Sequence, residues 1–416
     1  MTSRATTLAK QVMSRCDELG QCSSEPGRIT RLYLDEPMRA VHVRLSEWMH
    51  QAGLSPHVDN AGNCIGRLRS QTGEKVLLVG SHLDSVPGAG RYDGVLGVLI
   101  GVAVSEWLAG CDLPFHFDVM GFSEEEGVRF KMPYLGSAAV AGRFDPEWLL
   151  REDDKQTSMR EAMASFGLSP DELESCRYTP SEVIGFVEPH LEQGPVLERL
   201  EQPVGVVTGI VGQSRLQLAF RGEAGHAGTA PMSGRRDALV AASAFVQTVR
   251  DTALSIDGLK ATVGSLRVCP NASNVIPGVV ELTLDVRHLA DDVRRYGVDT
   301  LVDAGHSLAE AEHCTFEVLE ETAQHSVNAD ARLMTMLSDT IKECHGGPVL
   351  LESGAGHDAA IMGQVFPMAM LFLRHPGGVS HHPDERVELN DVATAIEVLG
   401  QYVLRLASDF SQHESA

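Results

Sequence analysis

The sequence has no long apolar run and no closely paired cysteines, and each absence excludes a class of protein. No apolar stretch approaches the length of a membrane-spanning helix, and residues 1–21 contain no apolar core of the signal-peptide kind. The eight cysteines are scattered without a Cys-x-x-Cys pair, which argues against a structural zinc–cysteine site and for reduced thiols. We therefore expect a cytoplasmic protein.

Basic residues are also scarce. The chain has 34 Lys and Arg against 57 Asp and Glu, a formal net charge of −23, which disfavours nucleic acid and anionic membranes as partners. No internal repeat, low-complexity segment or Gly-x-Gly-x-x-Gly fingerprint is present. At 416 residues the chain is too long for one ordinary core, so two domains are expected.

One stretch combines a buried strand with metal-ligating residue types. The β-branched run 75–79 predicts a strand with His82 and Asp84 at its carboxyl end, where ligands collect in open α/β sheets. A glycine-rich turn then presents Asp93 before a small-residue helix over 94–108. His82 would bind a metal through one ring nitrogen while Asp84 accepts the other N–H, and Asp93 could bridge two ions. The alternative is a helix N-cap role for Asp93.

A run of acids follows the next expected strand, 114–122. Glu125 and Glu126 belong to a triplet of glutamates flanked by Phe122 and Phe130, which suggests a partly buried loop. Unpaired carboxylates are costly in such a loop, so a metal site explains the run better than the alternative, a solvated acidic turn.

Two further histidines complete the candidate set. His190 lies between acids just before a Gly-Pro break, where a lone histidine is more often a surface residue, and His381 lies in a late punctuated loop. Separate strand ends and loops thus supply imidazole and carboxylate groups, a nitrogen and oxygen set that suits two zinc or manganese ions. The residues are His82, Asp93, Glu125, Glu126, His190 and His381.

The pattern of elements predicts an α/β chain with an insertion. A mixed, mostly parallel sheet flanked by helices forms the metal-binding catalytic domain, residues 1–211 and 326–416. A helix over 30–51 with a kink or a break at Pro37 is expected in its first part, followed by a strand pair over 55–68. From about residue 212 to 325 the order becomes β-α-β-β-α-β with alternating polar and apolar residues, the ferredoxin-like arrangement.

With these residues in place, the sequence resembles the hydantoinase/carbamoylase family of amidases, relatives of the aminoacylase-type zinc peptidases. The resemblance covers nearly the whole chain, and it rests on GSHLDSVPGAGRYDGVLG, SEEEGVRF, PHLEQGPVLE, GHAGTAPM, NASNVIPG, SGAGHDA and GVSHHPDE. Members include N-carbamoyl-L-amino-acid hydrolases, allantoate amidohydrolases, ureidoglycolate hydrolases and β-ureidopropionases. The resemblance implies hydrolysis of a ureido C–N bond.

Roles at the metal centre are implied by the same resemblance. His82 and His190 would bind one metal, Glu126 and His381 would bind the other, and Asp93 would bridge the two. The peptide bond between Asp93 and Gly94 is expected to be cis. Glu125 would be the general base that activates water, and Asp84 would orient His82. The family pattern has a small or polar residue where this chain has His382, so His382 is an alternative ligand to His381.

The resemblance also implies a substrate site and a partner. Substrate-binding positions are matched by Gln193, His226, Asn274, Arg287 and Gly356. The inserted domain is expected to act as a lid and to pair two subunits into a homodimer. Alternation along strand 281–287 places Asp285 and Arg287 on one face, so Arg287 either holds the substrate carboxylate or forms a surface pair with Asp285.

Substrate identity is less determined. Arg374 resembles the allantoate branch, but allantoate and N-carbamoyl amino acids both carry a carboxylate. Two alternative functions are an aminoacylase or dipeptidase, and a non-catalytic protein that binds metal or a small molecule. Glu125 discriminates against the second, because binding a metal does not require it.

Overall fold

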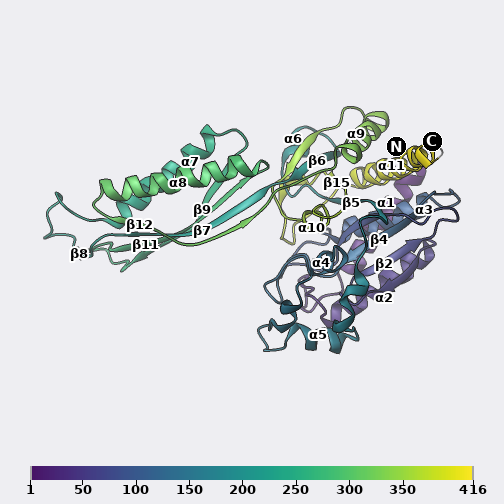
Figure 1. The fold of residues 1–416 in the computed structure, drawn as a ribbon, viewed down its shortest axis with the longest axis horizontal. Helices are drawn as coiled ribbons and strands as arrows, with labels where there is room; N and C mark the ends of the chain where they lie inside the picture. Colours follow the sequence, from purple (N-terminus) through teal and green to yellow (C-terminus); the bar gives the residue numbers. More distant parts are fainter. Residues whose placement is uncertain (1, 415–416) are drawn as a thin grey trace. The chain divides into compact units, whose positions relative to one another are not determined.

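The computed structural model describes residues 2–414, and Met1, Ser415 and Ala416 lie outside the described part. The chain divides into two compact units (Figure 1). Each unit has its own apolar core. Unit 1 comprises Met1–Thr208 and Ala329–Ala416, and unit 2 comprises Gly209–Asn328. Unit 2 thus begins and ends slightly outside the segment 212–325.

A mixed sheet forms the centre of unit 1. Its strands follow the order β1-β2-β4-β3-β5-β15-β6, and β14 also pairs with β6. The inner neighbours β4, β3, β5 and β15 are parallel, whereas β1, β2 and β6 are antiparallel to theirs. The bounds are β1 Ser55–Val58, β2 Cys64–Leu68, β3 Val76–His82, β4 His116–Phe122, β5 Val183–Leu191, β6 Val204–Ile210, β14 Leu350–Ser353 and β15 Met368–Leu373.

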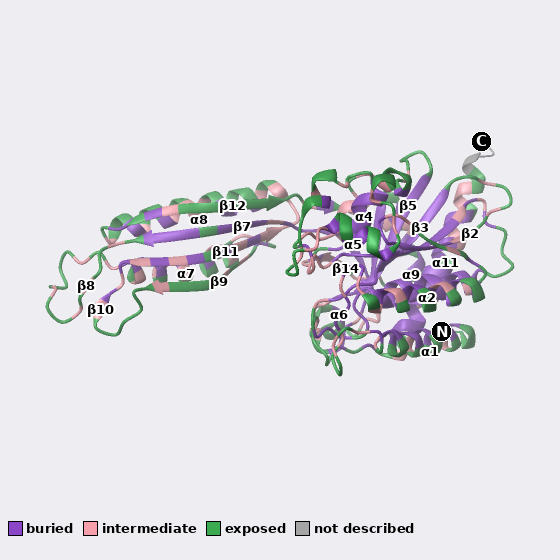
Figure 2. Ribbon diagram, turned by 90° about the horizontal axis from the view of Figure 1, so that it is seen from below, coloured by how far each residue is buried: buried purple, intermediate pink, exposed green. Residues whose placement is uncertain are grey.

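The parallel strands are apolar because both of their faces are covered. Every residue of β3, β5 and β15 is buried (Figure 2). Helix α3 packs on β3, β4 and β5 and also contacts α1 and α11, while α10 packs against β5 and β15. The predicted mixed sheet flanked by helices is therefore confirmed, with its parallel part confined to the inner strands.

The helices of unit 1 include short 3₁₀ turns, labelled η. The bounds are α1 Ser3–Leu19, α2 Glu36–Gln51, α3 Val95–Trp107, α4 Leu135–Val140, η1 Pro146–Leu150, α5 Met159–Phe166, η2 Pro170–Cys176, α6 Val196–Arg199, α9 Ala331–His345, α10 Asp358–Met362, η3 Pro376–Gly378 and α11 Leu389–Glu414. Within the described residues, no helix is both long and apolar enough to cross a membrane.

The predicted helix over 30–51 is wrong before residue 36, and the predicted helix breaks at Pro37 rather than kinking there. Helix α2 begins at Glu36, after Asp35 accepts the backbone N–H of Met38 at 3.0 Å. Pro37 therefore lies in the first turn, where its missing N–H costs no helical hydrogen bond. The preceding segment is not helical, and Arg31 and Ser85 exchange hydrogen bonds of 2.9 and 3.1 Å there.

Unit 2 contains a four-stranded antiparallel sheet of order β12-β7-β11-β9. Apolar residues such as Leu216, Leu218 and Phe220 alternate along β7 and are buried with residues of the two long helices. The bounds are β7 Gly212–Arg221, α7 Ala238–Ser255, β9 Lys260–Cys269, β11 Val279–His288, α8 Asp291–Ala311 and β12 Thr315–Gln324, with the short strands β8 Gly225–His226, β10 Val275–Ile276 and β13 Val327–Asn328. Strand β8 pairs with β10, and β13 pairs with the last residues of β6.

Candidate metal centre

The carboxyl ends of two neighbouring parallel strands bring two histidines together. His82 is the last residue of β3, and His190 is the penultimate residue of β5; both are 2% exposed. Their rings stack with centroids 5.7 Å apart. The surface position considered for His190 is therefore wrong, because β5 is an inner strand of the sheet and is buried along its whole length.

Each ring is oriented through its Nδ1 atom. Nδ1 of His190 lies 3.0 Å from the carbonyl oxygen of Leu191, and Nδ1 of His82 lies 3.2 Å from the carbonyl oxygen of Asp84. The Asp84 carboxylate is also 3.4 Å from His82 Nδ1. With the proton held on Nδ1, Nε2 of each ring is left as the metal-binding atom.

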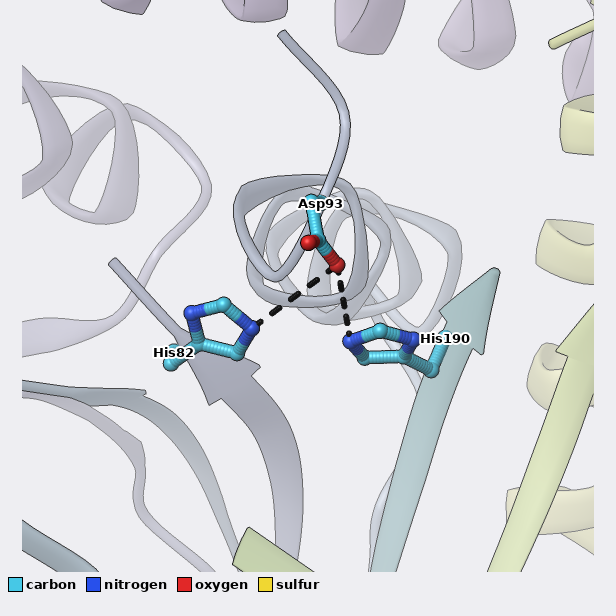
Figure 3. Close-up of side chains that lie close together, drawn as sticks. All are labelled: His82, Asp93 and His190. Atoms are coloured by element: carbon cyan, nitrogen blue, oxygen red, sulfur yellow. Dashed lines mark ion pairs between the residues drawn. The ribbon is translucent and has the colours of Figure 1, made fainter. Parts of the chain in front are cut away.

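Asp93 faces both rings with one carboxylate oxygen. Its Oδ1 lies 3.3 Å from Nε2 of His190 and 3.9 Å from Nε2 of His82, and Figure 3 shows both rings turned toward it. Gly94 is the N-cap residue before α3 and has φ 66°, and a Cβ there would lie 2.5 Å from the His82 ring. The expected cis Asp93–Gly94 peptide is not found: among the described residues the cis bond is Cys269–Pro270, and Gly94 makes the turn through its positive φ.

The other oxygen of Asp93 faces a second group of ligand types. Nε2 of His381 lies 3.3 Å from Asp93 Oδ2 and 3.4 Å from Glu126 Oε1. The set His82, Asp93 and His190 and the set Asp93, Glu126 and His381 each gather their potential ligand atoms within 4.8 Å. The neighbouring His382 instead pairs with Asp384, 3.5 Å away.

The chemistry of the donor set fits cations. Glu126 Oε1 and His190 Nε2 are buried and have no hydrogen-bond partner, which is costly unless an ion binds them. Burial raises the pKa of Glu126 to about 7 and lowers the pKa of His190 to about 4. A divalent metal binds a neutral imidazole, and its positive charge stabilises the ionised form of a buried carboxylate.

Asp84 positions the acidic loop as well as His82. Its Oδ1 accepts the backbone N–H of Glu125 and its Oδ2 accepts that of Glu126, both at 3.0 Å. Glu125 is 8% exposed, and burial raises the pKa of its carboxyl group well above the usual range. The acidic run is therefore a mostly buried loop in which one carboxylate holds the backbone N–H groups of Glu125 and Glu126.

Two residues beside Asp93 extend the site beyond its ligand set. Glu385 is 4% exposed, and its Oε1 accepts the backbone N–H groups of Tyr92 at 2.7 Å and Asp93 at 2.9 Å. Sequence reasoning missed Glu385, although it ends the GVSHHPDE motif. Gln193, expected to bind substrate, donates from Nε2 to both Asp93 oxygens at 3.2 and 3.3 Å and to Ser380 at 2.9 Å.

The other expected substrate residues fall into different parts of the chain. Gly356 lies in unit 1, in the loop between β14 and α10, whereas His226, Asn274 and Arg287 belong to unit 2. The pairing of β8 with β10 brings His226 next to Asn274, whose carbonyl oxygen accepts the N–H of Ala227 at 2.9 Å.

Two arginines of interest have carboxylate partners. Arg287 donates to Asp285 from Nε at 2.7 Å and from Nη2 at 3.1 Å, so the two side chains share a face as alternation predicts. Arg374 donates to both oxygens of the buried Asp391 at 2.7 Å, which gives it a structural partner at the start of α11. Because this ion pair accounts for Arg374, the residue is weaker support for an allantoate substrate.

Comparison with known proteins identifies the family of this chain. The profile of "Peptidase family M20/M25/M40" matches residues 78–405. A hydantoinase/carbamoylase family amidase from Burkholderia multivorans has a TM-score of 0.90 and 31% identity over 96% of this chain and 98% of that one. The chain belongs to the hydantoinase/carbamoylase amidases of the M20/M25/M40 peptidase family. The family expected from the motifs is confirmed.

Named relatives agree on the class of reaction and differ in substrate. The N-carbamoyl-L-amino acid amidohydrolase of Geobacillus stearothermophilus is 37% identical over 404 residues, which cover 96% of this chain and 98% of that protein. The probable allantoate deiminase of Oryza sativa subsp. japonica is 37% identical over 446 residues, which cover 97% and 89%. The predicted enzyme class, a hydrolase of C–N bonds other than peptide bonds, is confirmed at the level of the family.

Proposed function

We propose that this chain hydrolyses the ureido C–N bond of a small carboxylate substrate, an N-carbamoyl-L-amino acid or an allantoate-type compound. Cleavage would release ammonia together with CO2 or a ureido product. The observation that carries the proposal is Asp93, whose two oxygens face two separate sets of ligand types with Glu125 on the adjoining loop. The names of the relatives support the substrate class.

Two divalent ions, Zn²⁺ or Mn²⁺, fit the donor set. His82 and His190 would hold one, Glu126 and His381 the other, and Asp93 both. Such a pair supplies Lewis acidity that polarises the carbonyl group and lowers the pKa of water. Anomalous scattering from crystals loaded with either metal tests the pair: two adjacent peaks that share Asp93 are expected, and peaks away from Asp93 would refute it.

Glu125 is suited to move the proton in this reaction. Its raised pKa lets the carboxylate take a proton from the attacking water and keep it long enough to deliver it to the leaving nitrogen. The hydrogen bond from its backbone N–H to Asp84 limits how far the loop can move. A ureido carbon needs this help because two nitrogens share their lone pairs with its carbonyl group.

Residues of both units are proposed to bind the substrate. His226 accepts the backbone N–H groups of Gly228 and Thr229 at Nδ1, at 3.1 and 3.2 Å, so its proton resides on Nε2. That N–H can donate to the oxyanion that develops on the substrate. Arg287 would hold the substrate carboxylate through its planar fork, with Asn274, Gln193 and Gly356 as further contacts.

We further propose that unit 2 is the ferredoxin-like lid and dimerisation domain. Its sheet order, with the first strand between the third and the fourth, supports the ferredoxin-like assignment. The edge strand β9 is largely exposed, which leaves it available to a second subunit. Sedimentation of the intact chain tests the homodimer: a monomer at micromolar concentration would contradict it.

Ammonia release across a substrate panel tests the activity. The panel contains allantoate, ureidoglycolate, N-carbamoyl-L-methionine and N-carbamoyl-β-alanine, each with added Zn²⁺ or Mn²⁺. An N-acetyl amino acid and a dipeptide, followed by release of the free amine, serve as the matched amide arm. Turnover of a ureido member is expected. Faster turnover in the amide arm would indicate an aminoacylase or dipeptidase, and no turnover at all would indicate a binding protein.

A further inference from the structure

Tyr134 has an unusual backbone conformation beside the acidic loop. It precedes α4 with a left-handed backbone, φ 65° and ψ 27°, which is rare for an aromatic residue. Its N–H donates to the carbonyl oxygen of Glu125 at 3.3 Å, and the next N–H, of Leu135, donates to that of Glu124 at 2.9 Å. The backbone of Tyr134 is therefore tied to the loop that carries the proposed general base. Such local strain persists where the surroundings over-determine it, and functional sites are where it gathers.

The Tyr134 hydroxyl group lies against Gly356. A Cβ built on Gly356 would fall on the hydroxyl oxygen, far inside van der Waals contact, and 3.3 Å from the ring carbon that bears it. Only glycine at 356 thus leaves room for this hydroxyl group. Gly356 lies in the loop before α10, so the contact joins two segments that are far apart in the sequence.

The hydroxyl group is a donor without an acceptor of its own. Among the described residues, none accepts a hydrogen bond from it, and the hydroxyl oxygen is not fully buried. Burial and the neighbouring Glu125, Asp358 and Glu188 raise the pKa of Tyr134, so the phenol keeps its proton. A protonated donor that is not fully buried and has no partner in the protein is available to an acceptor on a bound molecule.

We propose that Tyr134 contacts the substrate, its hydroxyl group donating a hydrogen bond to the ureido group that is cleaved, with Gly356 kept small to admit the hydroxyl. This inference rests on the proposed function, because it assigns a residue to that same site. It also explains why residue 356 is a glycine: a side chain there would occupy the space of the phenol. Gly356 can contact the substrate as well.

Tyr134→Phe removes the hydroxyl group and leaves the ring. We expect kcat/KM for the best ureido substrate to fall about tenfold, the loss of one neutral hydrogen bond. Metal content and Tm should stay unchanged. Tyr402→Phe is the matched control, because that hydroxyl group is also without a partner but is completely buried in α11. It should leave kcat/KM as in the wild type.

A double-mutant cycle separates contact from mere packing. Gly356→Ala should cost activity in the wild type, because the methyl group displaces the hydroxyl, and should cost clearly less in the Tyr134→Phe background. If Tyr134→Phe retains full kcat/KM while the wild type is active, the Tyr134 assignment alone is wrong. A Tyr134→Phe protein that loses metal or Tm in step with activity would show a structural role instead. A wild type inactive on the whole substrate panel overturns the proposed function and this assignment with it.

Discussion

The carboxylate of Glu385 accepts the backbone N–H of Asp93 at 2.9 Å, and the same oxygen accepts the N–H of Tyr92 at 2.7 Å. Glu385 lies a short loop after His381, whose ring faces the Asp93 carboxylate. One buried side chain thus connects the loop that presents Asp93 with the loop that presents His381. Removing a group that orients metal-ligating residues in this way commonly weakens metal binding by one to two orders of magnitude.

Glu385→Ala should therefore weaken metal binding by about 10- to 100-fold, because both N–H groups lose their buried acceptor. Glu385→Gln retains one carbonyl oxygen in that place and should bind metal nearly as the wild type does. Metal content after graded dialysis against a chelator measures the difference. Glu388→Ala, a nearby exposed glutamate, is the control. Equal metal loss in the Gln and Ala variants would show that the charge of Glu385, and not its hydrogen bonds, matters.

Glu125 and Glu126 are neighbours whose substitution should have different effects. Glu125→Gln should abolish turnover while metal and substrate still bind, since an amide has the same size but cannot take a proton. Glu126→Gln should instead weaken the metal, because a charged ligand is lost. Both amides keep the backbone hydrogen bonds to Asp84, so loop position is matched between the variants. Isothermal titration with metal and a turnover assay separate the two roles, and equal metal loss in both would show them to be misassigned.

Replacing Arg287 by Lys should reduce kcat/KM as much as replacing it by Ala. The guanidinium group already uses its fork on Asp285, and a lysine cannot reproduce that geometry toward Asp285 or toward a substrate carboxylate. We expect kcat/KM to fall by two to three orders of magnitude, about 3–4 kcal/mol, with metal content unchanged. Arg215→Ala, which removes a more exposed arginine from the same Asp285 carboxylate, is the matched control.

The decisive comparison for Arg287 uses a carboxylate substrate and its amide. The wild type should prefer the carboxylate, and the Lys variant should lose most of that preference. A wild type that turns over both equally would show that Arg287 is not the anchor.

Glu188 should make the metal-free protein less stable as the pH rises. Burial raises its pKa from 4.5 to about 7, although Ser81 and the N–H of Ala359 donate to it, both at 2.8 Å. The folded state therefore binds the proton more tightly than the unfolded state, and this stability is lost between about pH 4.5 and 7. Glu188→Gln mimics the neutral form and should raise Tm relative to the wild type more at pH 8 than at pH 5. A Tm difference that does not change with pH would contradict this.

Local patterns in the sequence were enough to predict most elements of the fold. The apolar run before His82 predicted an inner strand, and the alternation along 215–222 predicted a strand with one exposed face, because periodicity reports which side of an element is buried. Motif identity was enough to predict the family. The start of the helix over 30–51 was misplaced because its periodic apolar residues extend back into a non-helical segment that is hydrogen-bonded to Ser85, a contact that periodicity does not encode.

The centre itself depends on contacts between distant parts of the chain. The sequence determined which ligand types follow which strands, but only the order β4-β3-β5 makes His82 and His190 neighbours, and only folding brings His381 to Asp93. The hydrogen bonds of Glu385 and Asp84 also join distant parts of the chain. A buried carboxylate must find donors wherever the tertiary structure supplies them, and here these are backbone N–H groups, which every non-proline residue carries and no sequence motif can mark.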